Sequence, residues 1–218
     1  MAATLLGAGD AARSVRWVLG SASPRRAEIF GLMGLQPEIV VSGFAEDLAK
    51  SSFATAAAYA EGTATEKARE VAGRLLPDAG AQPTVIVGSD TVVEIDGDVL
   101  EKPGDVEEAK AMLRRMSGRN HFVHSGVAVF SNLGGRDAGA PTMTFAETTE
   151  VTFVELTELD IENYVASREP MDKAGGYGIQ GLGGQMVCGL SGCYFNVMGF
   201  PMHRFSKSMA ELLLTDNA

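Results

Sequence analysis

Residues 83–103 read PTVIVGSDTVVEIDGDVLEKP, and this stretch decides the expected fold. The apolar run VIV is typical of a buried strand, because it is short and rich in β-branched residues. Asp96 and Gly97 form a two-residue sequence that favours a tight hairpin turn. The stretch therefore predicts a strand that leaves the core, turns and pairs with a second strand.

The hairpin also predicts which side chains lie close together. If the turn is regular, Ile95 faces Asp98, and the ladder runs back to pair Thr91 with Lys102. Asp90 would then be a close neighbour of Lys102. A β-bulge would shift this register by one residue.

Helices and strands alternate outward from this hairpin. Ser23 suits a helix N-cap, Pro24 the first helical position and Gly34 the stop. We expect strands at 15–22, 38–44, 121–130 and 145–155, helices at 24–33, 54–76, 105–117, 157–167 and 201–214, a loop at 131–142, a glycine-rich connection at 168–185 and a hairpin around 190–192. Hairpins interrupt the βαβ pattern, so the fold class is α/β with a mixed, twisted sheet flanked by helices.

Composition limits the function. The chain has 218 residues, 45% of them hydrophobic, and a net charge of −10, which argues against a protein that binds a nucleic-acid backbone. No run approaches the roughly 20 apolar residues that cross a bilayer. The first fifteen residues lack the features of a signal peptide. We therefore expect a cytoplasmic protein with neither a nucleic-acid nor a membrane partner.

Several familiar sites can be excluded from the sequence. There is no Gly-Lys dipeptide for a P-loop and no H-E-x-x-H or G-x-S-x-G motif. His121 and His124 share one predicted strand but face opposite sides, which argues against a shared metal. Cys188 and Cys193 lack a second cysteine pair for zinc and are more simply two half-buried thiols on a hairpin.

Two arginines stand at an electrostatically unfavourable position. Arg25 and Arg26 follow Ser23-Pro24 at a helix start, where the helix dipole is already positive. One interpretation is a solvated helix end. The other is a substrate-binding site for phosphate formed by Ser23, Arg25 and Arg26, which combines free backbone N–H groups with guanidinium donors. The stretch alone does not decide between them.

Other polar residues also allow two readings. Asp90 could activate water or hold a divalent cation, with the Thr91 hydroxyl beside it, or it could form an Asx-type turn. Lys67 lies at the edge of an apolar helix face, from which it could enter a cleft or simply reach solvent. Glu46 and Asp47 could cap a helix or bind metal.

The glycine-rich connection carries two more candidates. Gln180 could read the edge of a base and Lys173 could bind a phosphate. Taken alone, both are ordinary polar loop residues.

Taken together, SASPRRAEIF, TEKA, VIVGSDTVV, VLEKP and KAGGYGIQGLGG resemble, in this order, the Maf family of nucleoside triphosphate pyrophosphatases. The resemblance extends over about residues 17–205. It implies one elongated Maf/ITPase-like domain over 1–218, with two lobes around a central cleft, and a homodimer. It also implies hydrolysis of a nucleoside triphosphate to the monophosphate and pyrophosphate with a divalent cation, Mg²⁺ or Mn²⁺.

The same resemblance assigns roles to residues. The water-activating aspartate corresponds to Asp90 and the acidic metal-linked position to Glu46. The basic phosphate-binding residues correspond to Arg25, Arg26, Lys67 and Lys102.

The resemblance also narrows the substrate. The branch of the family that prefers dTTP and UTP has the equivalents of Arg25, Thr91 and Gln180, whereas the branch acting on 7-methyl-GTP has tryptophan after the proline. The alternative function is a nucleotide-binding regulator without turnover that uses the same cleft. Binding alone would not require Asp90 together with Lys102.

Overall fold

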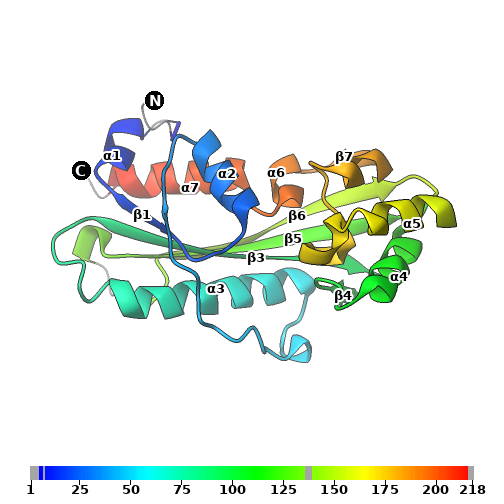
Figure 1. Ribbon diagram of the computed structural model, residues 1–218. Helices are drawn as coiled ribbons and strands as arrows, with labels where there is room; N and C mark the ends of the chain where they lie inside the picture. The colour runs from blue at the N-terminus through cyan, green and yellow to red at the C-terminus, as the bar shows by residue number, and fades with distance from the viewer. Residues whose placement is uncertain (1–4, 7, 136–138, 216–218) are drawn as a thin grey trace.

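A long mixed sheet forms the centre of the protein. The computed structural model describes residues 5, 6, 8–135 and 139–215 and shows an elongated molecule (Figure 1). The seven strands follow the order β2-β1-β3-β5-β6-β7, with β4 also paired to β3. β1 runs parallel to β2 and β3, and the other pairs are antiparallel. This confirms the expected α/β class with a mixed sheet flanked by helices.

The elements have the following bounds. The strands are β1 (Arg16–Leu19), β2 (Glu38–Ile39), β3 (Thr84–Ile95), β4 (Asp98–Leu100), β5 (Asn120–Ser131), β6 (Met143–Phe153) and β7 (Val187–Ser191). The helices are α1 (Gly9–Arg13), α2 (Pro24–Leu32), α3 (Ala56–Leu75), α4 (Val106–Met116), α5 (Glu158–Ala166), α6 (Tyr194–Met198) and α7 (Met202–Thr215).

Alternation along β3 divides the core between the two faces of the sheet. Val85 and Val87 pack on α1, α2 and α7, whereas Val93 and Ile95 pack on α4 and α5 at the far end of the same face. Between the two apolar clusters this face is polar. On the opposite face, α3 covers the sheet (Figure 1).

α3 lies unusually close to the sheet, because two strand positions lack a side chain. A Cβ atom added to Gly88 would lie 2.4 Å from the carbonyl oxygen of Ala64, and one added to Gly126 would lie 2.2 Å from that of Ala60. Both distances are far below contact distance. Glycine at these strand positions is therefore required for helix and sheet to meet.

The edge of β3 is interrupted. β5 occupies one edge, and β1 and β4 share the other, where β1 pairs as far as Val87 and β4 begins at Val93. No strand within the described ranges pairs with residues 88–92 on that edge. Side chains from both faces of β3 are therefore accessible at this gap.

The hairpin is confirmed, but its predicted extension is wrong. Ile95 faces Asp98 as expected, yet the ladder ends at the pair Val93–Leu100, so Thr91 and Lys102 do not pair. The Glu101 carbonyl instead accepts a hydrogen bond from the Gly175 N–H, 3.0 Å away. The Pro103 nitrogen carries no proton and cannot extend a ladder.

Two further predictions need correction. The strand expected at 38–44 contains only Glu38–Ile39, with the following residues extended but unpaired in a sheet. The hairpin expected around 190–192 does not form, because β7 pairs back with β6 and Cys193 is then the N-cap of α6. Both cysteines have free thiols, but Cys188 is exposed.

The remaining helices and strands are confirmed to within a few residues. Helix α2 begins at Pro24, but the Ser23 side chain makes no capping hydrogen bond. The loop expected at 131–142 includes residues 136–138, which lie outside the described residues. In the part of the chain that is described, no helix has the length and apolar character needed to cross a bilayer.

Candidate active site

A cavity of about 540 Å³ opens at the gap in the β3 edge. This volume lies within the range of ~300–1,000 Å³ that is usual for small-molecule sites. The cavity is lined by all ten predicted site residues: Ser23, Arg25, Arg26, Glu46, Lys67, Asp90, Thr91, Lys102, Lys173 and Gln180. The folded chain thus brings together residues that are spread over most of the sequence.

A buried lysine joins two carboxylates at the base of the cavity. Lys67 Nζ lies 2.7 Å from Asp90 Oδ1 and 2.7 Å from Glu46 Oε2. The Lys67 and Asp90 side chains are only 10% and 13% exposed, so water screens their interaction weakly. Lys67 reaches Asp90 because α3 approaches the sheet closely at Gly88 and Gly126.

Glu46 is held in an uncommon backbone conformation. Its φ is +55°, in the left-handed region that few residues other than glycine adopt. This conformation directs its carboxylate to Lys67, in agreement with the placement of Glu46 at the site. Non-glycine residues in such conformations cluster at functional sites.

The two carboxylates suit a hard cation such as Mg²⁺ or Mn²⁺, which prefers oxygen ligands. Within the described ranges, no group of three or more His, Cys, Asp or Glu side chains could hold a metal ion by itself. A cation bound by Asp90 and Glu46 would therefore complete its shell with phosphate oxygens and water, as Mg²⁺ commonly does.

Arg26 lies inside the protein, where it connects neighbouring segments through hydrogen bonds. It is buried and donates to the Gly199 carbonyl at 2.9 Å, to Ser21 Oγ at 2.9 Å and to Thr91 Oγ1 at 3.1 Å. Burial lowers the pKa of Arg26, an effect that the nearby Asp90 carboxylate opposes. Ser125 continues this network, with its Oγ 2.9 Å from Thr91 Oγ1.

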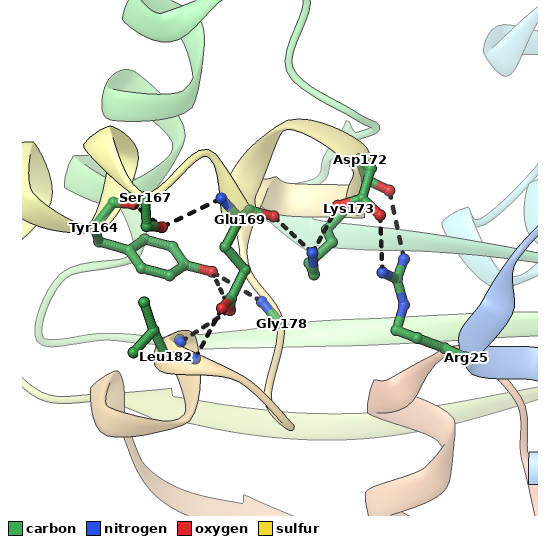
Figure 2. Close-up of polar contacts among 9 residues, drawn as sticks. Arg25, Tyr164, Ser167, Glu169, Asp172, Lys173, Gly178 and Leu182 are labelled. Atoms are coloured by element: carbon green, nitrogen blue, oxygen red, sulfur yellow. Dashed lines mark hydrogen bonds and ion pairs between the residues drawn. The ribbon is translucent and has the colours of Figure 1, made fainter. Parts of the chain in front are cut away.

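The Arg25 side chain points toward Asp172 (Figure 2). Its Nη1 lies 3.0 Å from Asp172 Oδ2, and Lys173 Nζ lies 2.6 Å from Asp172 Oδ1. One carboxylate thus holds two of the cations expected to bind phosphate. The two adjacent arginines have different partners, because successive helical residues diverge by about 100°.

Three other predicted residues keep their polar groups available. Among the described residues, the Ser23 hydroxyl, the Lys102 ammonium and the Gln180 amide have no hydrogen-bonding partner, yet all three line the cavity. Lys102 reaches the cavity although it leaves the β-ladder, but Asp90 pairs with Lys67 rather than with Lys102.

The sequence did not indicate Glu101, an acidic residue that also lines the cavity. Its carboxylate accepts from the Tyr59 hydroxyl at 2.8 Å and pairs with Lys50 at 2.8 Å. Burial raises the pKa of Glu101, but hydrogen bonds from Lys50 and Tyr59 outweigh this effect and hold the pKa below its usual value. Burial and the bond to Glu101 raise the pKa of Tyr59 to about 12. The position of Glu101 directly before Lys102 was the only signal available.

His121 supports the cavity wall and makes stability depend on pH. Its Nε2 lies 2.8 Å from the hydroxyl of Tyr177, which lines the cavity, and its ring packs edge-on against Phe153. Burial lowers the pKa of His121 to about 4, from an ordinary value of 6.5. The buried neutral ring is favoured, so protonation opposes folding.

We therefore expect the free energy of unfolding to be highest above pH 6.5 and to fall by about 3 kcal/mol between pH 6.5 and 4 through this residue. Urea unfolding across this range measures the loss. His124, whose pKa is also lowered by burial, remains in the comparison variant His121→Gln. An equally steep pH dependence in that variant would exclude His121 as the cause.

Comparison with known proteins identifies the family. Residues 16–212 match the family model described as Maf-like protein. The chain belongs to the Maf family. This confirms the resemblance that the motifs indicated.

Related Maf proteins carry informative names. The chain is 40% identical to "dTTP/UTP pyrophosphatase" of Clostridium perfringens, over 91% of this chain and 97% of that protein. It is 39% identical to the protein of the same name from Bacillus cytotoxicus, over 90% and 95%.

A human relative is longer. The chain is 49% identical, over 90% of its length, to the human "Probable bifunctional dTTP/UTP pyrophosphatase/methyltransferase protein", of which it spans 32%, about a third. A crystal structure of a nucleoside-triphosphatase / dITP/XTP pyrophosphatase from Mycobacterium abscessus aligns over 91% of this chain and 98% of that chain, at 15% identity and a TM-score of 0.40.

Proposed function

We propose that this Maf protein hydrolyses a nucleoside triphosphate, dTTP or UTP, to the monophosphate and pyrophosphate. The observation that supports this most directly is the meeting of a partly buried carboxylate, Asp90, with Arg25, Lys102 and Lys173 around one cavity. The names of the bacterial relatives, which match over almost their whole length, support the same reaction and the same bases.

The phosphate chain would lie between the start of α2 and the opposite cavity wall. The first backbone N–H groups of a helix have no intrahelical partner and attract anions. Arg25 at this helix start and Lys102 on the facing loop add charge-assisted donors. Fixed donors of this kind stabilise the charge that develops during phosphoryl transfer.

Asp90 would act as the general base. Its Oδ1 is held by Lys67, and within the described structure no hydrogen bond reaches Oδ2, which leaves that oxygen to accept a proton from water. Lys67 fixes the orientation of the carboxylate, because it is itself buried and bound to Glu46. The activated water would attack the α-phosphorus, and pyrophosphate would leave.

Asp90 and Glu46 would hold Mg²⁺ or Mn²⁺ together with substrate oxygens. When bound, such a cation would neutralise negative charge on the phosphate groups. Lys67, Arg25 and Lys102 orient the same phosphate groups from the protein side.

Gln180 and Thr91 would recognise the pyrimidine. A glutamine amide has one acceptor and two donors, which suits the adjacent carbonyl and N–H of uracil or thymine. The Thr91 hydroxyl is already occupied by Arg26 and Ser125, so Thr91 would contact the base through its methyl group. Arg26 then acts by holding Thr91 in place. A homodimer remains our prediction from the family resemblance, and a cytoplasmic location remains our prediction from the sequence.

A product assay tests this proposal. The purified protein is incubated with each of the eight common ribo- and deoxyribonucleoside triphosphates plus Mg²⁺ or Mn²⁺, and products are separated by ion exchange. We expect dTTP and UTP to give the monophosphate and pyrophosphate, with little reaction of purine nucleotides. Release of diphosphate and orthophosphate would contradict the reaction, and tight binding without hydrolysis would identify a regulator.

A further inference from the structure

The glycine-rich connection that carries Gln180 is folded around one carboxylate. Glu169 lies in a short 3-10 turn, Glu169–Asp172, just after α5, and its side chain points into the loop formed by residues 178–183 (Figure 2). Glu169 Oε2 accepts from the Leu182 N–H at 2.9 Å, and Oε1 accepts from the Gly183 N–H at 3.1 Å.

A tyrosine ties the other end of the loop to the same carboxylate. The Tyr164 hydroxyl donates to Glu169 Oε1 at 3.0 Å and accepts from the Gly178 N–H at 3.1 Å. Glu169 therefore holds both ends of a six-residue loop, directly at one end and through Tyr164 at the other. Gln180 lies between these two points and lines the cavity.

The loop passes so close to Glu169 that a side chain on Gly181 would displace the carboxylate. A Cβ atom added to Gly181 would lie 2.5 Å from both carboxylate oxygens. One added to Gly183 would lie 2.7 Å from the Tyr164 hydroxyl oxygen. The loop backbone thus wraps the carboxylate as a nest of N–H groups wraps an anion.

The negative charge of Glu169 suits this arrangement. Burial raises the pKa of Glu169, but its polar neighbours hold the pKa below its usual value. These neighbours are the Leu182 and Gly183 N–H groups, the Tyr164 hydroxyl and the Lys173 charge. A neutral amide at this position would have to turn its own NH₂ group toward one of the loop N–H donors. Removing the charge would therefore weaken the anchor while preserving the size of the side chain.

We propose that Glu169 is the positioning residue of the base-recognition loop, fixing Gln180 at the distance from which it selects the pyrimidine. Glu169 does not itself line the cavity. Its effect on selectivity therefore passes through Gln180. The identity of the substrate in this inference rests on the proposed function. The anchoring of the loop by Glu169 does not depend on that function.

The anchoring is tested first, without any nucleotide. Hydrogen–deuterium exchange of peptides covering residues 174–186 is compared between the wild type and Glu169→Gln. We expect exchange in this segment to become about tenfold faster, because a net hydrogen bond is worth about a factor of ten. Glu162→Gln, an exposed carboxylate on neighbouring α5, is the control and should leave exchange unchanged.

The role in recognition is tested with a double-mutant cycle. The ratio of kcat/KM for dTTP to that for dCTP is measured in Glu169→Gln, Gln180→Ala and the double variant. We expect each single variant to lose about tenfold in this ratio and the double variant to lose no more than Gln180→Ala alone. We also expect kcat for dTTP at saturation to change far less than the ratio does.

The outcomes separate the two hypotheses. Unchanged exchange, an unchanged ratio, or losses that add in the double variant would each overturn the positioning role. If the wild type hydrolyses no nucleotide, the proposed function fails, and the cycle is repeated with equilibrium affinities for dTTP and dCTP. If Glu169→Gln does not fold, Tyr164→Phe removes the hydroxyl that links Glu169 to Gly178 but keeps the direct bonds of Glu169 to the loop. This variant should give a smaller change in the same direction.

Discussion

Replacement of Asp90 by asparagine is expected to lower kcat on dTTP by about 100- to 10,000-fold, the usual contribution of a general base. Asparagine keeps the shape of the side chain and can still accept the hydrogen bond from Lys67 through Oδ1. It cannot take a proton from water. We therefore expect the fold and nucleotide affinity to persist while turnover is lost. Steady-state pyrophosphate release and equilibrium binding measure these two quantities separately.

A matched substitution elsewhere controls for the change in charge. Asp98→Asn alters an exposed carboxylate on β4 that pairs with Arg115 and does not line the cavity. Its kcat should equal that of the wild type. A near-normal kcat in Asp90→Asn would remove Asp90 from the role of base, whatever the control shows.

Replacement of Gly126 by alanine is expected to lower the free energy of unfolding by about 3 kcal/mol, the upper part of the usual range for overpacking. The added methyl group would meet the Ala60 carbonyl oxygen at 2.2 Å and the Glu61 nitrogen at 2.4 Å. These are backbone atoms, so relief requires α3 to move away from the sheet. Such a movement would also separate Lys67 from Asp90. Urea unfolding and kcat on dTTP should therefore both decrease.

The control for this substitution lies on α3 itself. Gly73 has open space where its Cβ would be, and alanine favours a helix over glycine by about 0.5–1 kcal/mol. Gly73→Ala should leave activity unchanged and make the protein slightly more stable. If Gly126→Ala were as stable as the wild type, the close approach of helix and sheet would not be as the structure shows it.

Local signals in the sequence predicted most of the fold. The turn Asp96-Gly97, the Pro24 helix start and the apolar run of β3 each depend on neighbouring residues only, and each is confirmed. The wrong predictions lie where residues distant in the sequence compete for the same backbone hydrogen bonds. β4 ends early because the Glu101 backbone bonds to Gly175, and no pattern near the hairpin indicates that contact.

In the candidate site, too, local sequence signals predicted some features, whereas contacts between distant residues were not predicted. Successive helical residues diverge by about 100°, so the sequence already indicates different surroundings for Arg25 and Arg26. The packing of α2 against the sheet then buries Arg26 near Thr91, while Arg25 faces Asp172. The anchoring residue Glu169 was missed because its partners are main-chain N–H groups, which leave no signal in the type of residue that carries them.

The interrupted edge of β3 also bears on aggregation. An unpaired sheet edge is a template on which a strand from another molecule can add. Here β1 and β4 pair with β3 on either side of residues 88–92, so an incoming strand would have to fit into a short gap. It would also have to displace the lysines and arginines around the cavity. The gap thus leaves room for a small ligand in the cavity but little room for an added strand.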